Sequence, residues 1–328
     1  MSDEGPRPPY FLGIDLGGTN IKSGVVDDDG RPFPSVSLPT LANRGPEAGL
    51  ATLAEAGRRA VQASGLAWSQ IEGVGLGSPG TMDINAGMLL EPPNLPGWNS
   101  LPIRDLLSKA LGKPAILQND ANAAAYGEYW AGAGRGTKSL GLFTLGTGVG
   151  CGIIDHGRII QGRHSHAAEC GHMIIEMENG RLCPCGQLGH LEAYASATSL
   201  VKRAVEALQR GETSTLRQLL DDSQLTARDI DQAANDGDPL ARRLMRETAH
   251  YLAVGAVNLM HTIDPDIILF AGGMIAAGQE FLDAIRADVR TMAFPVCAAN
   301  TRIEFAGLGG DAGFIGAAGC ARLAFRPG

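Results

Sequence analysis

One stretch of nine residues near the start of the chain decides the fold class. It reads Phe11-Leu12-Gly13-Ile14-Asp15-Leu16-Gly17-Gly18-Thr19, a short apolar run that ends in a carboxylate and two glycines. A second apolar run over residues 21–26 follows and leads into an aspartate-rich turn that closes with Gly30. Two short apolar runs joined by a glycine-rich bend are typical of a β-hairpin. We therefore expect the fold to start with two antiparallel strands.

The same pattern returns 129 positions further along the chain. The second copy reads Leu140-Gly141-Leu142-Phe143-Thr144-Leu145-Gly146-Thr147-Gly148, and it is also followed by an apolar run and a turn, Asp155-His156-Gly157. Glycine-rich hairpins are common by themselves, so a chance likeness is one explanation. An internal duplication is the other, and it predicts two related lobes that face each other across one cleft.

The rest of the chain alternates between strand and helix patterns. Strands are expected over residues 73–76, 115–118, 266–271 and 302–306, and helices over 46–64, 100–111, 197–209, 226–235, 239–262, 281–292 and 311–323. Ser100 is expected to cap the helix over 100–111, because serine is a favoured N-cap residue. Strands that alternate with helices place the protein in the α/β class.

Composition narrows the classes of function. The 328 residues include 35 Asp and Glu against 27 Lys and Arg, a net charge of -8, and only 5% are aromatic. Nucleic-acid binding draws on clustered basic residues and aromatic platforms, so it is not expected here. No leader-like segment or apolar run of about 18 residues is present, and the six cysteines are few. We expect a cytoplasmic protein with no membrane partner.

Two glycine motifs match the dinucleotide-binding fingerprint only superficially. Gly75-Leu76-Gly77-Ser78-Pro79-Gly80 is followed by turn residues rather than by a helix, and the motif over 307–312 leaves no room for further βα units. The fingerprint needs both, because the pyrophosphate binds at the N-terminus of the following helix. A dehydrogenase is therefore disfavoured.

The two duplicated bends are candidate phosphate-binding loops. Glycine lets backbone N–H groups approach a phosphate, and a carboxylate such as Asp15 can hold Mg²⁺ directly or through water. Two such loops suit a nucleoside triphosphate. The candidate nucleotide-binding residues are Asp15, Gly17, Gly18, Thr19 and Asn20 from the first bend and Gly146, Thr147 and Gly148 from the second.

Asn119 and Asp120 stand between an expected strand and an alanine-rich helix. Both residue types are favoured N-caps, so capping alone explains them in one reading. In the other, Asp120 accepts the proton of an attacking hydroxyl and Asn119 hydrogen-bonds the acceptor. Phosphoryl transfer needs mainly positioning, charge neutralisation and one such base.

A Cys-x-Cys loop flanked by histidines is the candidate metal site. His172, Cys183, Cys185 and His190 offer four ligands for tetrahedral zinc. Buried thiols or a redox pair are the alternatives. Two carboxylates, Glu169 and Glu192, flank the same loop and suggest hydrogen bonds to a polyhydroxy ligand.

These motifs, in this order, resemble the ROK family (repressors, open reading frames and kinases), bacterial sugar kinases with an actin-like ATPase fold. The motifs that carry the resemblance lie at residues 15–20, 119–123, 145–148, 169–172 and 183–192. The resemblance covers the chain from Phe11 to the last expected helix. It implies a two-lobed, ribonuclease H-like α/β fold. One lobe would comprise residues 1–119 joined by the helix over 311–328, and the other residues 120–310 with the zinc loop.

The resemblance also implies an activity, the ATP- and Mg²⁺-dependent phosphorylation of D-glucose at its 6-hydroxyl with Asp120 as general base. The sugar-binding residues would be Asn99, Asn119, Asp120, Glu169, His172 and Glu192. Asn99 lies in a loop, residues 94–99, that looks like the glucose-side loop of family glucokinases. Gly272 and Gly273, together with the Gly309-Gly310 region, look like adenosine-binding segments.

Other members of the family leave alternatives open. Kinases for N-acetylglucosamine, N-acetylmannosamine, mannose or fructose share the scaffold, and polyphosphate is a second possible phosphoryl donor. A sugar-binding regulator would carry a DNA-binding segment before the first glycine loop, where only residues 1–10 stand, so it is disfavoured. Family members are commonly homodimers or homotetramers, and the sequence does not decide between them.

The zinc loop departs from the family pattern at one position. The family's third cysteine is replaced here by His190. Imidazole is also a good zinc ligand, so we expect a structural site with two histidines and two cysteines. A last expectation concerns the 45 glycines, many of which cluster near residues 17, 146–152, 272 and 307–313. We expect these clusters to lie where backbone approaches phosphate or adenosine.

Overall fold

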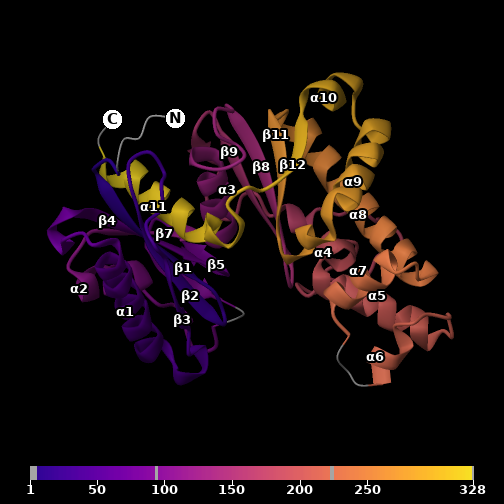
Figure 1. Ribbon diagram of the computed structural model, residues 1–328, viewed down its shortest axis with the longest axis horizontal. Coiled ribbons are helices and arrows are strands. Elements are labelled where there is room, and N and C mark those ends of the chain that lie inside the picture. The colour runs from indigo at the N-terminus through magenta and orange to yellow at the C-terminus, as the bar shows by residue number, and fades with distance from the viewer. Residues whose placement is uncertain (1–5, 93–94, 222–224, 327–328) are drawn as a thin grey trace. The chain divides into compact units, whose positions relative to one another are not determined.

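The computed structural model describes residues 6–92, 95–221 and 225–326. Contacts within the chain group it into two compact units (Figure 1). The first unit comprises Met1–Lys138, Gly152–Ala168 and Gly307–Gly328, and the second comprises Ser139–Cys151 and Glu169–Ala306. The domain boundaries expected from the sequence, 1–119 with 311–328 and 120–310, stay a prediction.

Two five-stranded sheets repeat one topology. Their strand orders are β3-β2-β1-β4-β7 and β10-β9-β8-β11-β12. The strands of the first are β1 (Tyr10–Leu16), β2 (Asn20–Val26), β3 (Val36–Pro39), β4 (Ile71–Ser78) and β7 (Ala115–Asn119); those of the second are β8 (Ser139–Leu145), β9 (Val149–Asp155), β10 (Arg158–Ile159), β11 (Ile267–Gly272) and β12 (Arg302–Phe305). Each boundary of the β8–β9 pair lies 129 positions after its counterpart in β1–β2. The duplication read from two motifs therefore extends to the order of all five strands.

In the first unit, helices cover both faces of the sheet. Four helices take part, namely α1 (Pro46–Ser64), α2 (Ile103–Leu111), α3 (Asp120–Trp130) and α11 (Ala312–Phe325). Along β1, Leu12 and Ile14 join the core beneath α1 and α2, whereas Phe11 packs with Phe314 of α11. This alternation follows from the two-residue period of a strand. The opposite placement of α1 and α11 is visible in Figure 1.

Glycines let α11 lie unusually close to this sheet. A Cβ atom at Gly13 of β1 would overlap the carbonyl oxygen of Phe314, and one at Gly75 of β4 would overlap that of Ala317. Gly75 belongs to the fingerprint-like motif, so its role is packing. The motif continues into a strand, β5 (Thr81–Asp83), which pairs with β6 (Met88–Glu91), and the expected absence of a following helix is confirmed.

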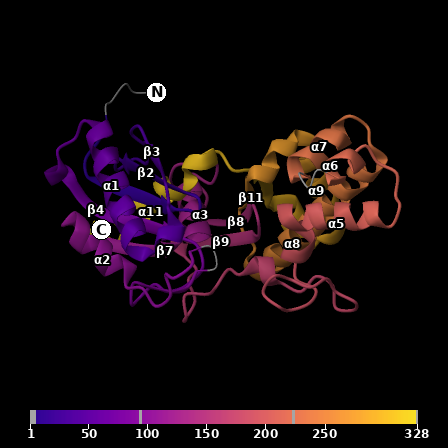
Figure 2. The same ribbon diagram turned by 90° about the horizontal axis from the view of Figure 1, so that it is seen from below.

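Helices dominate the second unit beyond its sheet. They are α4 (Glu192–Ala195), α5 (Ala197–Gln209), α6 (Arg217–Asp221), α7 (Ala227–Asn235), α8 (Pro239–Ile263), α9 (Gly278–Met292) and α10 (Pro295–Asn300). The long α8 contacts α4, α5, α7 and α9. Figure 2 shows α8 with α5, α7 and α9. Its start is specified locally, because the Asp238 side chain accepts a hydrogen bond from Ala241 N at 3.0 Å and Pro239 occupies the first turn.

One predicted helix start is wrong. The helix over 100–111 begins at Ile103, after Pro102, and no side chain caps it. Ser100 has a φ of 55°, outside the extended conformation of an N-cap residue, and its N–H donates to Leu90 O at 3.1 Å. The pairing of Leu101 with Leu89 holds residues 100–102 beside β6 instead. Within the described part of the chain, no helix is both long and apolar enough to cross a membrane.

Candidate functional site

In the first unit, three parallel strands bring the candidate residues to one edge of the sheet. Asp15 pairs with Gly77 near the end of β1 and β4, and Ser78 pairs with Asn119 at the end of β4 and β7. Because neighbouring strands lie about 4.8 Å apart, Asp15 and Asn119 are separated by about 10 Å across β4. The first glycine loop and the Asn119-Asp120 pair therefore share the carboxyl-terminal edge of this sheet.

The surroundings of Asp15 do not fully stabilise the charged form of its carboxyl group. Burial raises the pKa of Asp15 to about 6, and the nearby Lys22 lowers it only in part. The Lys22 ammonium is itself 2.6 Å from the Asp311 carboxylate and donates to Gly310 O at 3.0 Å. A divalent cation beside Asp15 would favour its ionised form, so this carboxyl fits the role of a Mg²⁺ ligand.

Two hydrogen bonds from Thr40 hold the backbone of the first glycine loop. Thr40 donates from its hydroxyl to Gly17 O at 2.6 Å and from its backbone to Thr19 O at 2.8 Å. Gly18, Thr19 and Asn20 are exposed. The segment over 307–313, expected to approach adenosine, lies beside this loop in the first unit. A Cβ at Gly313 would overlap the Asp15 carboxylate.

Asn119 and Asp120 begin α3. Asn119 is its N-cap residue, and its side-chain oxygen accepts from Asn122 N at 3.1 Å. Capping is thus confirmed as one role of Asn119. Asp120 lies in the first turn, where the helix dipole favours a negative charge, and its carboxylate accepts from Ala121 N at 2.9 Å. A carboxylate at this edge is the kind of group that a general base requires.

Asn99 lies in a loop that a tryptophan anchors. Trp98 is fully buried, and a Cβ at Gly49 of α1 would overlap its indole ring. Asn99 itself is exposed. Asn94, with which the expected glucose-side loop begins, falls outside the described residues.

In the second unit, the second glycine loop borders a cavity of about 420 Å³. Gly146 and Thr147 lie on its wall together with Gly273, which follows β11. Gly272 has a φ of 95°, and a Cβ there would overlap Leu145 O, so its glycine allows β11 to end close against β8. Three of the expected nucleotide-binding residues thus surround one space.

Helix residues that the motifs did not indicate complete this cavity. Ala197, Leu200, Met245 and Met274 give it apolar walls, while Arg228 and Asp231 of α7 add charge. An apolar cavity with a few polar groups is the usual form of a small-molecule site. The helical spacing of 226–235 predicted α7, but nothing in the sequence showed which of its residues face this cavity.

Glu192 joins the second glycine loop to the cysteine loop. One carboxylate oxygen accepts from Val149 N at 2.9 Å, directly after Gly148, and the other lies 3.8 Å from Cys183 Sγ. A Cβ at Gly148 would overlap this carboxylate. Glycine at 148 therefore makes room for an acid that comes from another segment.

The four expected metal ligands gather in one place. The ligand atoms of His172, Cys183, Cys185 and His190 all lie within 4.8 Å of one another. The Nδ1 atoms of the histidines are 3.7 Å from Cys183 Sγ and 3.2 Å from Cys185 Sγ, respectively. Zinc–sulfur and zinc–nitrogen bonds at a tetrahedral angle place these atoms about 3.6 Å apart. The residues therefore fit a zinc ion.

Electrostatics also favour a cation at this cluster. Burial lowers the pKa of His190, and His172 beside it lowers it further, so the imidazole can offer a lone pair. Burial raises the pKa of Cys183 to about 12, so the thiol keeps its proton unless a positive charge lies beside it. Glu169 is exposed, with its carboxylate 4.0 Å from His172 Nε2, on the side of the ring away from Cys183.

Two repeated five-stranded α/β sheets with a glycine loop after the first strand of each define an actin-like ATPase fold. The chain belongs to the ROK family, because the model of that family matches residues 11–323.

Individual relatives agree over nearly the whole chain. A glucokinase from Halalkalibacterium halodurans is 35% identical over 94% of this chain and 93% of its own length. A solved ROK hexokinase from Thermus thermophilus is 34% identical with a TM-score of 0.82 and covers 96% of this chain and 98% of its own. A ROK glucokinase from Streptomyces griseus, solved with glucose and AMPPNP, is 34% identical with a TM-score of 0.79 and covers 96% and 99%.

Proposed function

We propose that this protein is a hexose kinase, and specifically a glucokinase that transfers the γ-phosphoryl group of ATP to the 6-hydroxyl of D-glucose. One observation carries the proposal, the similarity along almost the full length to glucokinases, one of them solved with glucose and AMPPNP. The retention of both glycine loops and of Asp120 supports it.

The first unit would supply the base and a cation ligand. Asp120 takes the proton of the 6-hydroxyl as that oxygen attacks phosphorus, while Asn119 and Asn99 hydrogen-bond the sugar. Asn119 can do so through its amide N–H groups, because its oxygen already caps α3. Asp15 holds Mg²⁺, which neutralises charge on the phosphates, and the backbone of residues 17–20 faces them.

The second unit would supply nucleotide and sugar contacts. Gly146, Thr147 and Gly148 approach the phosphates, and Gly272 and Gly273 lie beside the adenosine, for which the cavity of about 420 Å³ is the candidate space. Glu169, His172 and Glu192 hydrogen-bond sugar hydroxyls. A structural zinc ion held by His172, Cys183, Cys185 and His190 keeps the loop that carries these groups in place.

The direct test is a coupled assay across a sugar panel. Purified protein is incubated with Mg²⁺, ATP or polyphosphate, and glucose, mannose, fructose, N-acetylglucosamine or N-acetylmannosamine. We expect ATP with glucose to give the highest kcat/KM. A higher value for another sugar would reassign the substrate within the hexose kinases. Absence of phosphorylation of every sugar, in protein that has kept its metal, would contradict the proposal.

The base is tested separately with Asp120→Asn. This change keeps the side-chain shape and the helix start but removes the proton acceptor. We expect kcat to fall by about 10³-fold or more while glucose still binds, as measured by calorimetry. Turnover within tenfold of the unchanged protein would remove Asp120 from this role.

A further inference from the structure

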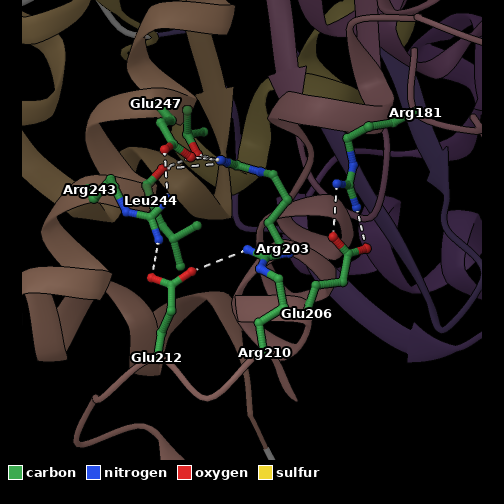
Figure 3. Close-up of polar contacts among 9 residues, drawn as sticks. Arg181, Arg203, Glu206, Arg210, Glu212, Arg243, Leu244 and Glu247 are labelled. Carbon is green, nitrogen blue, oxygen red and sulfur yellow. Dashed lines mark hydrogen bonds and ion pairs between the residues drawn. The ribbon is translucent and has the colours of Figure 1, made fainter. Parts of the chain in front are cut away.

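Arg181, two residues before Cys183, is bonded in three directions. Its carbonyl oxygen accepts from Gly189 N at 2.9 Å, across the cysteine loop and next to His190. Its N–H donates to the Tyr194 hydroxyl oxygen at 2.7 Å, in α4. Its guanidinium donates to both carboxylate oxygens of Glu206 in α5, with one of these contacts at 2.9 Å (Figure 3). The backbone of Arg181 is therefore tied to Gly189 and α4, and its side chain is tied to α5.

The ion pair with Glu206 has the geometry of a strong anchor. Two parallel N–H···O bonds between a guanidinium and a carboxylate combine charge with fixed direction. The pair holds the pKa of Glu206 below its usual range. Both side chains are partly exposed, at 29% and 43%, so water weakens the pair without abolishing it.

The partners of Arg181 are themselves fixed to α8. The Tyr194 ring lies 4.9 Å from that of Tyr251, and the Arg203 guanidinium lies over the same Tyr251 ring at 5.3 Å. Arg203 also pairs with Glu247 at 2.8 Å (Figure 3). The anchor for Arg181 is therefore a packed framework of α4, α5 and α8 rather than a mobile surface side chain.

Helix α5 connects this anchor to the second glycine loop. Ala197, at its first residue, donates from its N–H to Gly146 O at 3.0 Å and lies on the wall of the cavity near Thr147. Glu206 is nine residues further along α5, about 13 Å away at 1.5 Å per residue. One rigid helix thus contacts the glycine loop at one end and the arginine beside the metal ligands near the other.

We propose that Arg181 is a positioning residue, which holds the metal-binding loop, and with it His172 and Glu192, in register with α5 and the glycine loop. Arg181 lies outside the groups assigned to sugar, nucleotide or metal. Its effect on sugar binding rests on the proposed function, whereas its effect on the metal-binding loop does not.

The test compares Arg181→Ala with a matched control, Arg243→Ala. Arg243 pairs with Glu212 and Glu247 in a separate set of ion pairs, and these bonds do not reach the cysteine loop (Figure 3). We expect Arg181→Ala to raise the KM for glucose by about 3- to 10-fold, with kcat and the KM for ATP within about twofold. Transfer of zinc from the loaded protein to a chromophoric chelator should be faster by a similar factor.

Two further variants keep the outcome decisive. Glu206→Gln breaks the same pair from the α5 side and should reproduce both effects, also if Arg181→Ala fails to fold. Arg181→Lys should recover part of the loss, because lysine keeps the charge but not the paired bonds. Unchanged glucose KM and unchanged zinc transfer in Glu206→Gln, or equal effects in Arg243→Ala, would overturn the inference. If the unchanged protein phosphorylates no sugar, the proposed function fails, and zinc transfer alone decides whether Arg181 anchors the loop.

Discussion

The loops after β1 and after β8 occupy equivalent places in the duplicated sheets. The carboxylate beside each loop, however, comes from a different part of the chain. In the first, Asp15 is part of the strand itself, and the equivalent position 129 residues later is Thr144. In the second, the acid is Glu192, which reaches Val149 N from beyond the cysteine loop. The first glycine carbonyl of each loop is held alike, Gly17 O by Thr40 and Gly146 O by Ala197.

This difference shows how one duplicated element can serve two tasks. An acid built into the strand is suited to hold a cation at a constant place. An acid supplied by another segment makes the loop depend on the position of that segment. If the cysteine loop moves, Val149 N loses its hydrogen-bond acceptor, Glu192. The first loop is therefore expected to act in charge neutralisation, and the second to link nucleotide binding with the cysteine loop.

Among changes to the two loops, removing the acid of the first is expected to have the largest effect. Asp15→Ala should lower kcat/KM for ATP by about 10²- to 10³-fold, since the proposed Mg²⁺ ligand is lost. Thr144→Ala, the same change at the equivalent strand position, should alter it by less than about threefold. Steady-state kinetics at saturating glucose measure both. Similar losses in the two variants would mean that the loops do not differ in the way described.

Replacing Glu192 should have an effect of intermediate size on the use of both glucose and ATP. Glu192→Ala removes the acceptor of Val149 N and the carboxylate beside Cys183, so kcat/KM should fall by about 10- to 100-fold for glucose and for ATP. Glu192→Gln keeps an oxygen for Val149 N and should spare ATP more than glucose. If both variants lower kcat/KM for glucose only, the proposed link between the second glycine loop and the cysteine loop is contradicted.

Asp15 should also make stability depend on pH in the unusual direction. Its pKa is raised by burial from 3.8 to about 6, so between these values the folded state binds more protons than the unfolded state. Its contribution to the free energy of unfolding is therefore fully present below pH 4 and is lost as pH rises through about 6. Urea unfolding without Mg²⁺ should show Asp15→Asn gaining about 1–2 kcal/mol relative to the unchanged protein between pH 4 and pH 7.5.

That comparison is a difference between two proteins at each pH, so carboxylates common to both cancel. A constant difference across the pH range would show that Asp15 titrates normally. A matched measurement on Thr144→Ala should give no pH-dependent difference, because threonine does not ionise.

The smallest expected effect concerns Gly146 itself. No atom lies within 4 Å of a Cβ built at this position, so Gly146→Ala should change the free energy of unfolding by less than about 0.5 kcal/mol. Any loss should appear in the KM for ATP, because the methyl group would enter the space that phosphate needs. A large loss of stability without a change in ATP binding would mean that Gly146 has a structural role and is not part of the ATP site.

The sequence predicted those parts of the site that depend on neighbours in the chain. The hairpins, the edge position of Asn119 and the gathering of His172 with the cysteine loop follow from strand ends, turn residues and ligand spacing. The Asp15–Gly77 and Ser78–Asn119 pairings agree with that expectation. Roles within the site stay predictions until the variants are measured.

Interactions between distant segments could not be predicted in this way. Nothing local distinguishes Arg181, paired with Glu206, from other surface arginines, and the start of α2 was set by the pairing of Leu101 with Leu89 rather than by Ser100. The glycines show the same limit. The packing roles of Gly13 and Gly75 were not predicted, yet both glycines are required by the approach of α11, a helix some 240 or more residues away in sequence.

The packing of α11 on β1 has a consequence for synthesis of the chain. Both β1 and β4 precede α11 in the chain, so their glycine-lined face stays bare while the roughly 240 residues between β4 and α11 are made. The core beneath α1 and α2 can form during that interval, but the cluster that joins Phe11 to Phe314 cannot. A nascent chain stalled before residue 312 should therefore engage chaperones or be cleaved at this face, and synthesis of α11 completes the first unit in a single late step.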